Sequence, residues 1–290
     1  MATVFRNLGY LTSGKGSALA ALVPIILLVL ACTTTAVEQQ REDSFFVRPS
    51  PTLIVKSDGG RISVSPGPEG VIVVHAELQN SSKLDYQVYR DGDGIIIEAK
   101  HVALFRSLSL LDAPSVDLSI TAPMSTYLEL TTLDGDVEIE GLSASGKIST
   151  SKGGIYLVDF IGDVDAQTID GDIEIIRYEG NATLNTMNGA VRIIDGVGSF
   201  DVRTQKGDIA FAGELAPGSV NGMYAAIGDI SVSLAGDPSL RLLATSSASP
   251  IQNSLPMRID GASSTCLSGI VGSGDAELII QALDGSVSIR

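Results

Sequence analysis

The sequence predicts an all-β protein whose main part is a β-solenoid, a stack of β-helix-like coils of about 18 residues and two strands each. We call each coil a rung. Three observations predict this fold class: glycines at a constant interval, apolar residues two positions apart beside each glycine, and residue types that persist from repeat to repeat. The turn glycines, at intervals of 18 residues, are Gly135, Gly153, Gly171, Gly189 and Gly207.

Apolar and polar residues alternate on both sides of each glycine. This period of two predicts strands with one buried face. A single rung cannot bury its apolar face alone, so neighbouring rungs must stack on one another. The apolar columns are Leu130, Ile148, Ala166, Leu184 and Val202 before the glycine, and Val137, Ile155, Ile173, Val191 and Ile209 after it.

An antiparallel meander of hairpins is the alternative, because Asp134-Gly135 and Asn188-Gly189 are favoured hairpin turns. A threonine column favours the solenoid, since parallel stacking places identical residues beside one another. We expect these hydroxyls to lie at an inner corner of the coil and to bond a neighbouring turn. The column consists of Thr132, Thr150, Thr168, Thr186 and Thr204.

The repeat region spans residues 126–290, and a more irregular region of β-strands spans residues 45–125. The segment "TLIVKSDGGRISV" around Gly60 has the apolar pattern of a rung, so the first strands belong to the same stack. The segment "ELIIQALDGSVSI" places Gly285 at the turn position, which predicts that the chain ends on a last rung. Between Asp91 and Gly94 we expect a hairpin.

Two irregular segments depart from this regular pattern. A polar loop insertion near residues 245–256 interrupts the stack, and an apolar loop occupies residues 101–113. Loops on a regular scaffold often carry binding residues, so both are candidate binding segments.

The N-terminal residues 1–31 have the layout of a lipoprotein-type signal peptide. Arg6 and Lys15 precede the apolar run "ALAALVPIILLVLAC", which is short and interrupted by Pro24. Its end resembles the bacterial lipobox, and the resemblance implies that Cys32 becomes the lipid-carrying N-terminus. Leu30 is bulkier than the usual residue there, so an uncleaved anchor and a soluble secreted protein remain alternatives.

A polar segment, residues 32–44, follows the signal. It lacks a hydrophobic period and predicts a flexible tether, with folding beginning near Phe45. The expected location is the cell envelope, with the chain lipid-anchored to a membrane and facing outside the cytoplasm.

Charge and cysteine content limit the chemistry. Acidic residues outnumber basic ones by 34 to 19, so the phosphate backbone of a nucleic acid is repelled and nucleic acid is excluded as a partner. Besides Cys32 the chain has only Cys266, which we interpret as a small buried apolar residue. A catalytic thiol is disfavoured because neither His75 nor His101 has a local motif that connects it to Cys266.

The repeated Asp-Gly-Asp turns raise the question of a calcium site, because carboxylates on adjacent rungs would lie about 4.8 Å apart. The residue before each turn glycine varies, however, as Asp134, Lys152, Asp170, Asn188 and Lys206. Adjacent rungs never both supply a pair of carboxylates. We therefore predict neither a metal nor a cofactor, and interpret these residues as turn formers.

The sequence contains no recognised catalytic motif, so we predict no catalytic residue. A carbohydrate-active enzyme with a groove along the stack remains the alternative, because such enzymes carry clustered carboxylates or a Lys or Arg base in a groove built across several rungs. Three or more carboxylates converging in one concave groove would favour it.

Together, "TLIVKSDGGRISV", "GVIVVHAEL", "PSVDLSITAP" and "LELTTLDGDVEIEGL" resemble the bacterial putative adhesin family, extracytoplasmic β-solenoid domains without an assigned activity. The resemblance covers residues 45–290. It implies the fold and transfers no catalytic or cofactor-binding residue. We expect a membrane-anchored structural or interaction module without catalytic activity, with envelope glycan or protein as its partner.

Overall fold

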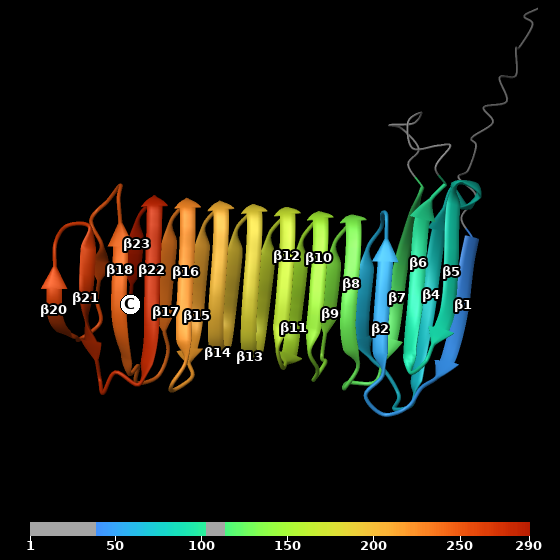
Figure 1. Ribbon diagram of the computed structural model, residues 1–290, viewed down its shortest axis with the longest axis horizontal. Coiled ribbons are helices and arrows are strands. Elements are labelled where there is room, and N and C mark those ends of the chain that lie inside the picture. The colour runs from blue at the N-terminus through green and yellow to red at the C-terminus, as the bar shows by residue number, and fades with distance from the viewer. Residues whose placement is uncertain (1–38, 103–113) are drawn as a thin grey trace, which may run out of the picture. The chain divides into compact units, whose positions relative to one another are not determined.

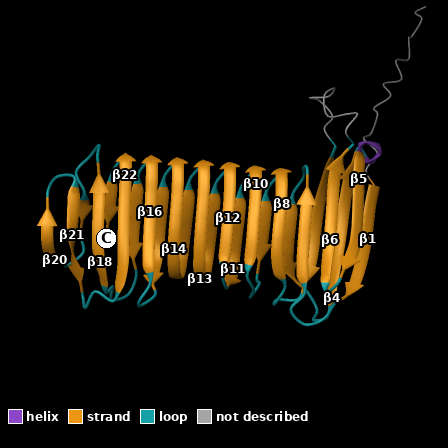
Figure 2. Cartoon of the chain, in the orientation of Figure 1, coloured by secondary structure: helices purple, strands orange, loops and turns teal. Residues whose placement is uncertain are grey.

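The computed structural model describes residues 39–102 and 114–290. All of these belong to one compact unit, Ala36–Arg290, in which the strands form a regular stack (Figure 1). The signal peptide, Cys32, the first part of the expected tether and the apolar loop at residues 103–113 lie outside the described residues. Strands and short connections make up nearly all of the described chain, and its one helical element is a 3-10 turn, Ser81–Lys83 (Figure 2). Within the described ranges, no helix has the length and apolarity needed to cross a membrane.

The stack consists of a front sheet, which faces the viewer in Figure 1, and a back sheet behind it. In spatial order the front sheet contains β20 (Arg258–Ala262), β21 (Cys266–Val271), β18 (Leu240–Ser246), β22 (Ala276–Asp284), β16 (Val220–Ile227), β14 (Val191–Lys206), β13 (Ile173–Asn188), β12 (Val164–Asp170), β10 (Gly146–Lys152), β8 (Tyr127–Asp134), β2 (Thr52–Ser57), β6 (Gly94–His101) and β5 (Leu84–Asp91).

The strands of the back sheet are given from the same end of the stack. This sheet contains β19 (Gln252–Asn253), β23 (Val287–Ile289), β17 (Ile230–Leu234), β15 (Ile209–Leu215), the first halves of β14 and β13, β11 (Ile155–Ile161), β9 (Val137–Glu140), β3 (Ile62–Pro66), β7 (Ser115–Ala122), β4 (Val71–Gln79) and β1 (Gln39–Phe46). Strands β13 and β14 belong to both sheets because they continue around the corner of the coil.

The repeats pair in parallel with a register of one rung. Ile148 lies opposite Ala166, and Thr150 lies opposite Thr168, each pair 18 residues apart. The predicted β-solenoid is therefore confirmed, and the meander of hairpins is wrong for this region. In-register parallel pairing explains why one residue type can fill a column, since each side chain faces its equivalent on the next rung.

The core lies between the two sheets and is continuous along the stack. Residues of the predicted apolar columns, such as Leu130 and Ile173, are fully buried. An aromatic row adds to them: Phe160 stacks on Tyr178, with ring centroids 6.2 Å apart, and Tyr178 contacts Phe200 at 5.9 Å. The rung after Tyr178 has Gly196 at the equivalent position. There the Phe200 ring occupies the space that a side chain at position 196 would need. A Cβ added to Gly196 would lie 2.9 Å from this ring.

Three successive rungs turn at a residue in the left-handed region, between the back strand and the next corner. Asp159, Arg177 and Asp195 have φ values of 54°, 53° and 55°. Aspartate tolerates this conformation better than most residues, whereas arginine is uncommon there. Two bonds from Arg177 to the Asp159 carboxylate, of 2.5 and 2.7 Å, hold the side chain of the arginine across the rungs.

At the N-terminal end of the stack, the spatial order of the strands differs from their order along the chain. Strand β2 lies between β8 and β6, and β3 lies between β9 and β7, so the first strands belong to the stack as expected. The hairpin at Asp91–Gly94 joins β5 to β6 in antiparallel pairing.

The expected tether, residues 32–44, needs a correction at its C-terminal end, because β1 begins at Gln39 and pairs with β4. The sequence of β1, "QQREDSFF", shows little hydrophobic alternation. It lies at the edge of the back sheet, where an apolar face is not required and charged residues protect the open edge.

The expectation that the chain ends on the last rung of the stack is wrong. Strand β22 and the turn at Gly285 lie between β16 and β18, so the chain ends inside the stack and not at its end. The end of the stack is formed by β21 and β20, which pair in antiparallel orientation. The polar segment 245–256 contains the end of β18 and the two-residue strand β19.

A candidate binding groove on the front sheet

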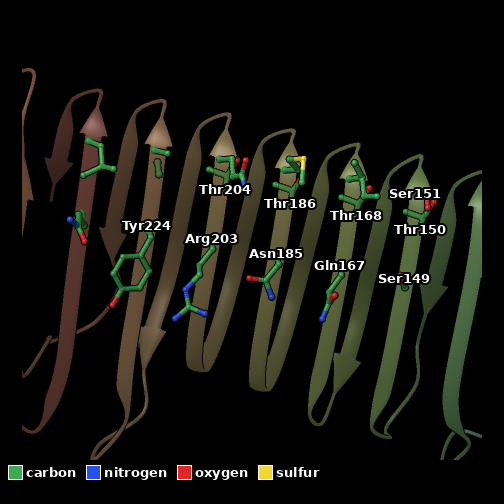
Figure 3. Close-up of a pocket in the computed structure, with 17 residues that line it drawn as sticks. Ser149, Thr150, Ser151, Gln167, Thr168, Asn185, Thr186, Arg203, Thr204 and Tyr224 are labelled. Carbon is green, nitrogen blue, oxygen red and sulfur yellow. The ribbon is translucent and has the colours of Figure 1, made fainter.

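A groove of about 590 Å³ crosses the front sheet near the ends of its strands (Figure 3). It extends over β10, β12, β13, β14, β16 and β22, with each strand supplying the same positions. We call this feature the front groove. Its side chains come from outward-facing positions of the rungs, so its geometry follows directly from the parallel register.

The floor of the front groove is a column of hydrogen-bonding side chains that run from rung to rung. Pairing places each member directly opposite the next. A second column, two residues further along each strand, borders the floor and contains several exposed apolar side chains. The floor is Ser149, Gln167, Asn185, Arg203, Tyr224 and Gln281, and the border includes Ile169, Met187 and Leu283.

Tyr224 and Arg203 are held in place by their neighbours. The guanidinium carbon of Arg203 lies 5.2 Å from the centroid of the Tyr224 ring, within cation–π range. The same guanidinium lies 3.0 Å from the Asp201 carboxylate on its own strand. The Tyr224 ring lies over Gly222, where an added Cβ would be 2.5 Å from a ring carbon. Gly222 therefore leaves room for the ring against the sheet.

Two amides of the floor make no hydrogen bond to any other described residue. Asn185 and Gln281 have free carboxamides, whereas Gln167 donates from Nε2 to the Asp165 carboxylate at 3.0 Å and keeps its oxygen free. A carboxamide presents both donors and an acceptor. The floor can therefore bond a ligand that itself both donates and accepts.

The threonine column lies beneath the front groove and has a structural role. Thr150 donates from its hydroxyl to the carbonyl oxygen of Gly135 at 3.1 Å, and Thr168 donates to Gly153 at the same distance. Thr186 and Thr204 continue the row to Gly171 and Gly189. Thr132 begins the column, and its buried hydroxyl has no partner among the described residues.

The turn glycines allow the rungs to approach one another. An added Cβ on Gly171 would lie 1.9 Å from the carbonyl oxygen of Gly153, and Gly285 would meet Gly228 at the same distance. Gly135 and Gly207 also have left-handed φ values of 153° and 152°. The remaining glycines of the column, Gly153 and Gly189, approach the preceding turn in the same way.

The aspartates after the turn glycines bond the next rung. The Asp136 carboxylate accepts from the Gly154 N–H at 2.8 Å, and Asp172 accepts from Ala190 at 2.7 Å. Asp229 accepts from both the N–H and the hydroxyl of Ser286, and these bonds lower the pKa of its carboxyl. In the part of the chain that the structure describes, no group of three or more metal-ligating side chains comes together.

Tyr224 and Arg203 are the only titratable side chains among the described lining residues of the front groove. Among its 17 described lining residues there is no aspartate, glutamate, histidine or cysteine. Glycoside cleavage needs a pair of carboxyl groups, so the converging carboxylates that would favour a carbohydrate-active enzyme are not found in this groove. Elsewhere, His75 and His101 lie on β4 and β6 near one end of the stack. Cys266, which we expected to be buried, is instead half-buried on β21, at the other end of the stack.

Sequence reasoning did not single out Tyr224, Arg203 or Gly222. The one available signal is the interval between Gly207 and Gly228, which is 21 residues where the earlier rungs have 18. The extra residues include Asn221, whose fully buried side chain bonds the rungs on both sides. The neighbouring positions of β16 thus depart from the repeat.

The described residues form a two-sheet β-solenoid with a neutral, polar groove along one sheet. A family model described as Toastrack DUF4097 matches residues 49–185 and again 161–290. The chain belongs to this family, and the match confirms the resemblance drawn from the strand motifs. A comparison with curated proteins found no match.

Three solved structures resemble the chain, and each alignment covers 87% of the present chain. A putative adhesin from Bacteroides fragilis has 11% identity and a TM-score of 0.48 over 97% of its own chain. A putative cell adhesion protein from Clostridium sporogenes has 11% identity and a TM-score of 0.34 over 99%. A putative lipid binding protein from Parabacteroides distasonis has 9% identity and a TM-score of 0.40 over 96%. None of these likenesses bears on the ligand of this chain.

Proposed function

We propose that the chain is a non-catalytic, adhesin-like binding module of the cell envelope, anchored by a lipid on Cys32 and facing outside the cytoplasm. The observation that carries the binding role is the front groove, a continuous row of hydrogen-bonding side chains whose described lining residues include no carboxylate or imidazole. The Toastrack DUF4097 match, which indicates no catalytic family, supports this reading. The lipobox-like end of the signal supports the anchor.

The anchor is tested by fractionating cells that express the full chain, with a clickable fatty-acid label. The wild type should enter the membrane fraction and carry the label. Cys32→Ser should lose both, whereas Cys266→Ser, which changes the only other cysteine, should keep both. Membrane retention without label in Cys32→Ser would instead show an uncleaved anchor.

The binding role is tested by incubating the full chain in mild detergent with isolated envelope polysaccharide and with envelope proteins. We expect material to sediment with the protein while the number of reducing ends stays constant. Newly formed reducing ends would show the carbohydrate-active enzyme that is the alternative. A protein that retains neither kind of material would overturn the proposed binding role.

A further inference from the structure

We propose that the front groove binds a neutral, linear glycan that lies across the rungs, with a sugar ring on Tyr224 and hydroxyls bonded to Asn185, Gln167 and Gln281. This inference rests on the proposed function, because it names the ligand of the binding module. Four properties of the groove support it: charge, aromatic surface, hydrogen-bonding capacity and direction.

The charge of the groove favours a neutral ligand. The protein has a formal net charge of -15, yet none of the described lining residues of the groove carries a carboxylate. The one cation among these described residues, Arg203, lies 3.0 Å from Asp201 and is neutralised by it. An anionic polymer would meet an acidic protein and no unpaired cation among the described lining residues, and the carboxylates nearest the floor, Asp165 and Asp201, are already bonded to Gln167 and Arg203.

The aromatic surface is fixed before a ligand arrives. Gly222 lets the Tyr224 ring lie against the sheet, and Arg203 contacts the ring from the adjacent rung. A ring that is already oriented loses little conformational entropy on binding. An aromatic ring offers an extended apolar surface with a polar hydroxyl at its edge, which suits the C–H face of a sugar ring.

The hydrogen-bonding capacity of the floor matches that of a polyol. The carboxamides of Asn185 and Gln281 have no partner within the described chain, and the Gln167 oxygen is also free. Each sugar hydroxyl both donates and accepts, as a carboxamide does. Exposed Ile169 and Met187 border the amides and supply contacts for the less polar ring edges.

The direction of the groove distinguishes a glycan from an extended peptide. A peptide strand usually binds at a sheet edge, where free backbone groups are available. The front groove instead crosses strands β10 to β22, whose backbone groups are already paired with their neighbours. Only side chains can bond its ligand, and they recur at the rung spacing of about 4.8 Å. A linear polymer of similar repeating units can use each rung in turn.

The experiment measures binding of the detergent-solubilised full chain to an array of linear hexasaccharides. The array contains neutral β-linked glucose, N-acetylglucosamine and xylose oligomers, with polyuronate and sulfated oligomers as charged probes. We expect binding to at least one neutral oligomer. Tyr224→Ala should weaken it about tenfold, and Asn185→Ala about fivefold.

Two further variants distinguish a loss of contact with the ligand from a general loss of folded structure. Gly222→Ala should also weaken binding, because its new Cβ displaces the Tyr224 ring while the ring itself remains present. Thr183→Ala is the matched control, since Thr183 is exposed on the same strand as Asn185 but outside the groove. It should leave the affinity unchanged. Far-UV circular dichroism confirms that each variant has kept its strands.

Several outcomes would overturn the inference. Binding of charged oligomers alone, or of neutral oligomers with unchanged affinity in Tyr224→Ala and Asn185→Ala, excludes the front groove as a site for a neutral glycan. If the chain binds no oligomer of the array but still sediments envelope material, this inference fails and the proposed function stands. If it binds neither, both fail.

Discussion

The side chain of Asn221 is predicted to be essential for the stability of the stack. It is fully buried on β16, at the point where the 18-residue repeat is broken. Its Oδ1 accepts from the Phe200 N–H at 2.8 Å, and its Nδ2 donates to the Glu277 carbonyl at 3.0 Å and to the Ser219 hydroxyl at 2.8 Å. The amide thus supplies bonds to both adjacent rungs.

Asn221→Leu removes these bonds without leaving a large cavity. The Phe200 N–H and the Glu277 carbonyl then lose the side-chain partner that bonds them. Each unsatisfied buried group costs about 1–3 kcal/mol, so the two groups together would lower the free energy of unfolding by about 2–6 kcal/mol. The apolar transfer energy of the leucine offsets a part of this loss, so we expect a decrease of about 2–4 kcal/mol.

Urea denaturation of the full chain, followed by far-UV circular dichroism, measures the change. Asn185→Leu is the matched control, because its amide has no partner among the described residues, and its effect should stay within about 0.5 kcal/mol. If the two variants unfold at the same urea concentration, the reasoning that Asn221 replaces backbone bonds between rungs is refuted.

Three more predictions concern the contacts between rungs. Gly171→Ala should prevent normal folding, since its Cβ would lie 1.9 Å from the Gly153 carbonyl oxygen; a soluble variant with the wild-type melting temperature would contradict this. Thr168→Val should lower the free energy of unfolding by about 1 kcal/mol, whereas Thr132→Val should leave it equal or higher, because only Thr168 donates a hydrogen bond. Paired urea titrations compare the two, and an equal loss would count against the assigned bonds. Asp229 has a lowered pKa in the folded state, so its contribution is present above the pKa of the unfolded chain and is lost as the pH falls through the folded value. The stability difference between wild type and Asp229→Asn should therefore be larger at pH 7 than at pH 3, and a difference independent of pH would exclude this role.

The rungs could be predicted because their signals are local and repeated. Gly171 and Thr168 each recur at an interval of 18 residues, and parallel in-register stacking places equivalent residues in contact. The corner at Arg177 was not predicted, because arginine is uncommon in the left-handed region and gives no turn signal. Its conformation accompanies the ion pair with Asp159, a contact between rungs.

The candidate site was harder to foresee than the fold. Polar residues at outward positions, such as Asn185, look the same in sequence whether they line a groove or face open solvent. Tyr224 stands out only when Gly222 is seen beneath its ring and Arg203 beside it. The contact of Arg203 with Tyr224 joins residues of different rungs, and the interval of 21 residues at this place hides their alignment.

The strands, the turns and the parallel coil of this protein follow from its sequence, because period-two alternation and an 18-residue repeat reflect strand geometry and stacking. The order of the rungs at both ends of the stack depends on contacts between distant parts of the chain. Strand β2 lies between β8 and β6, and β22 lies between β16 and β18. The repeat does not specify this order, because a rung with matching apolar columns can stack on any other. The sequence pattern specifies what a rung is, whereas packing of the whole chain selects its neighbours.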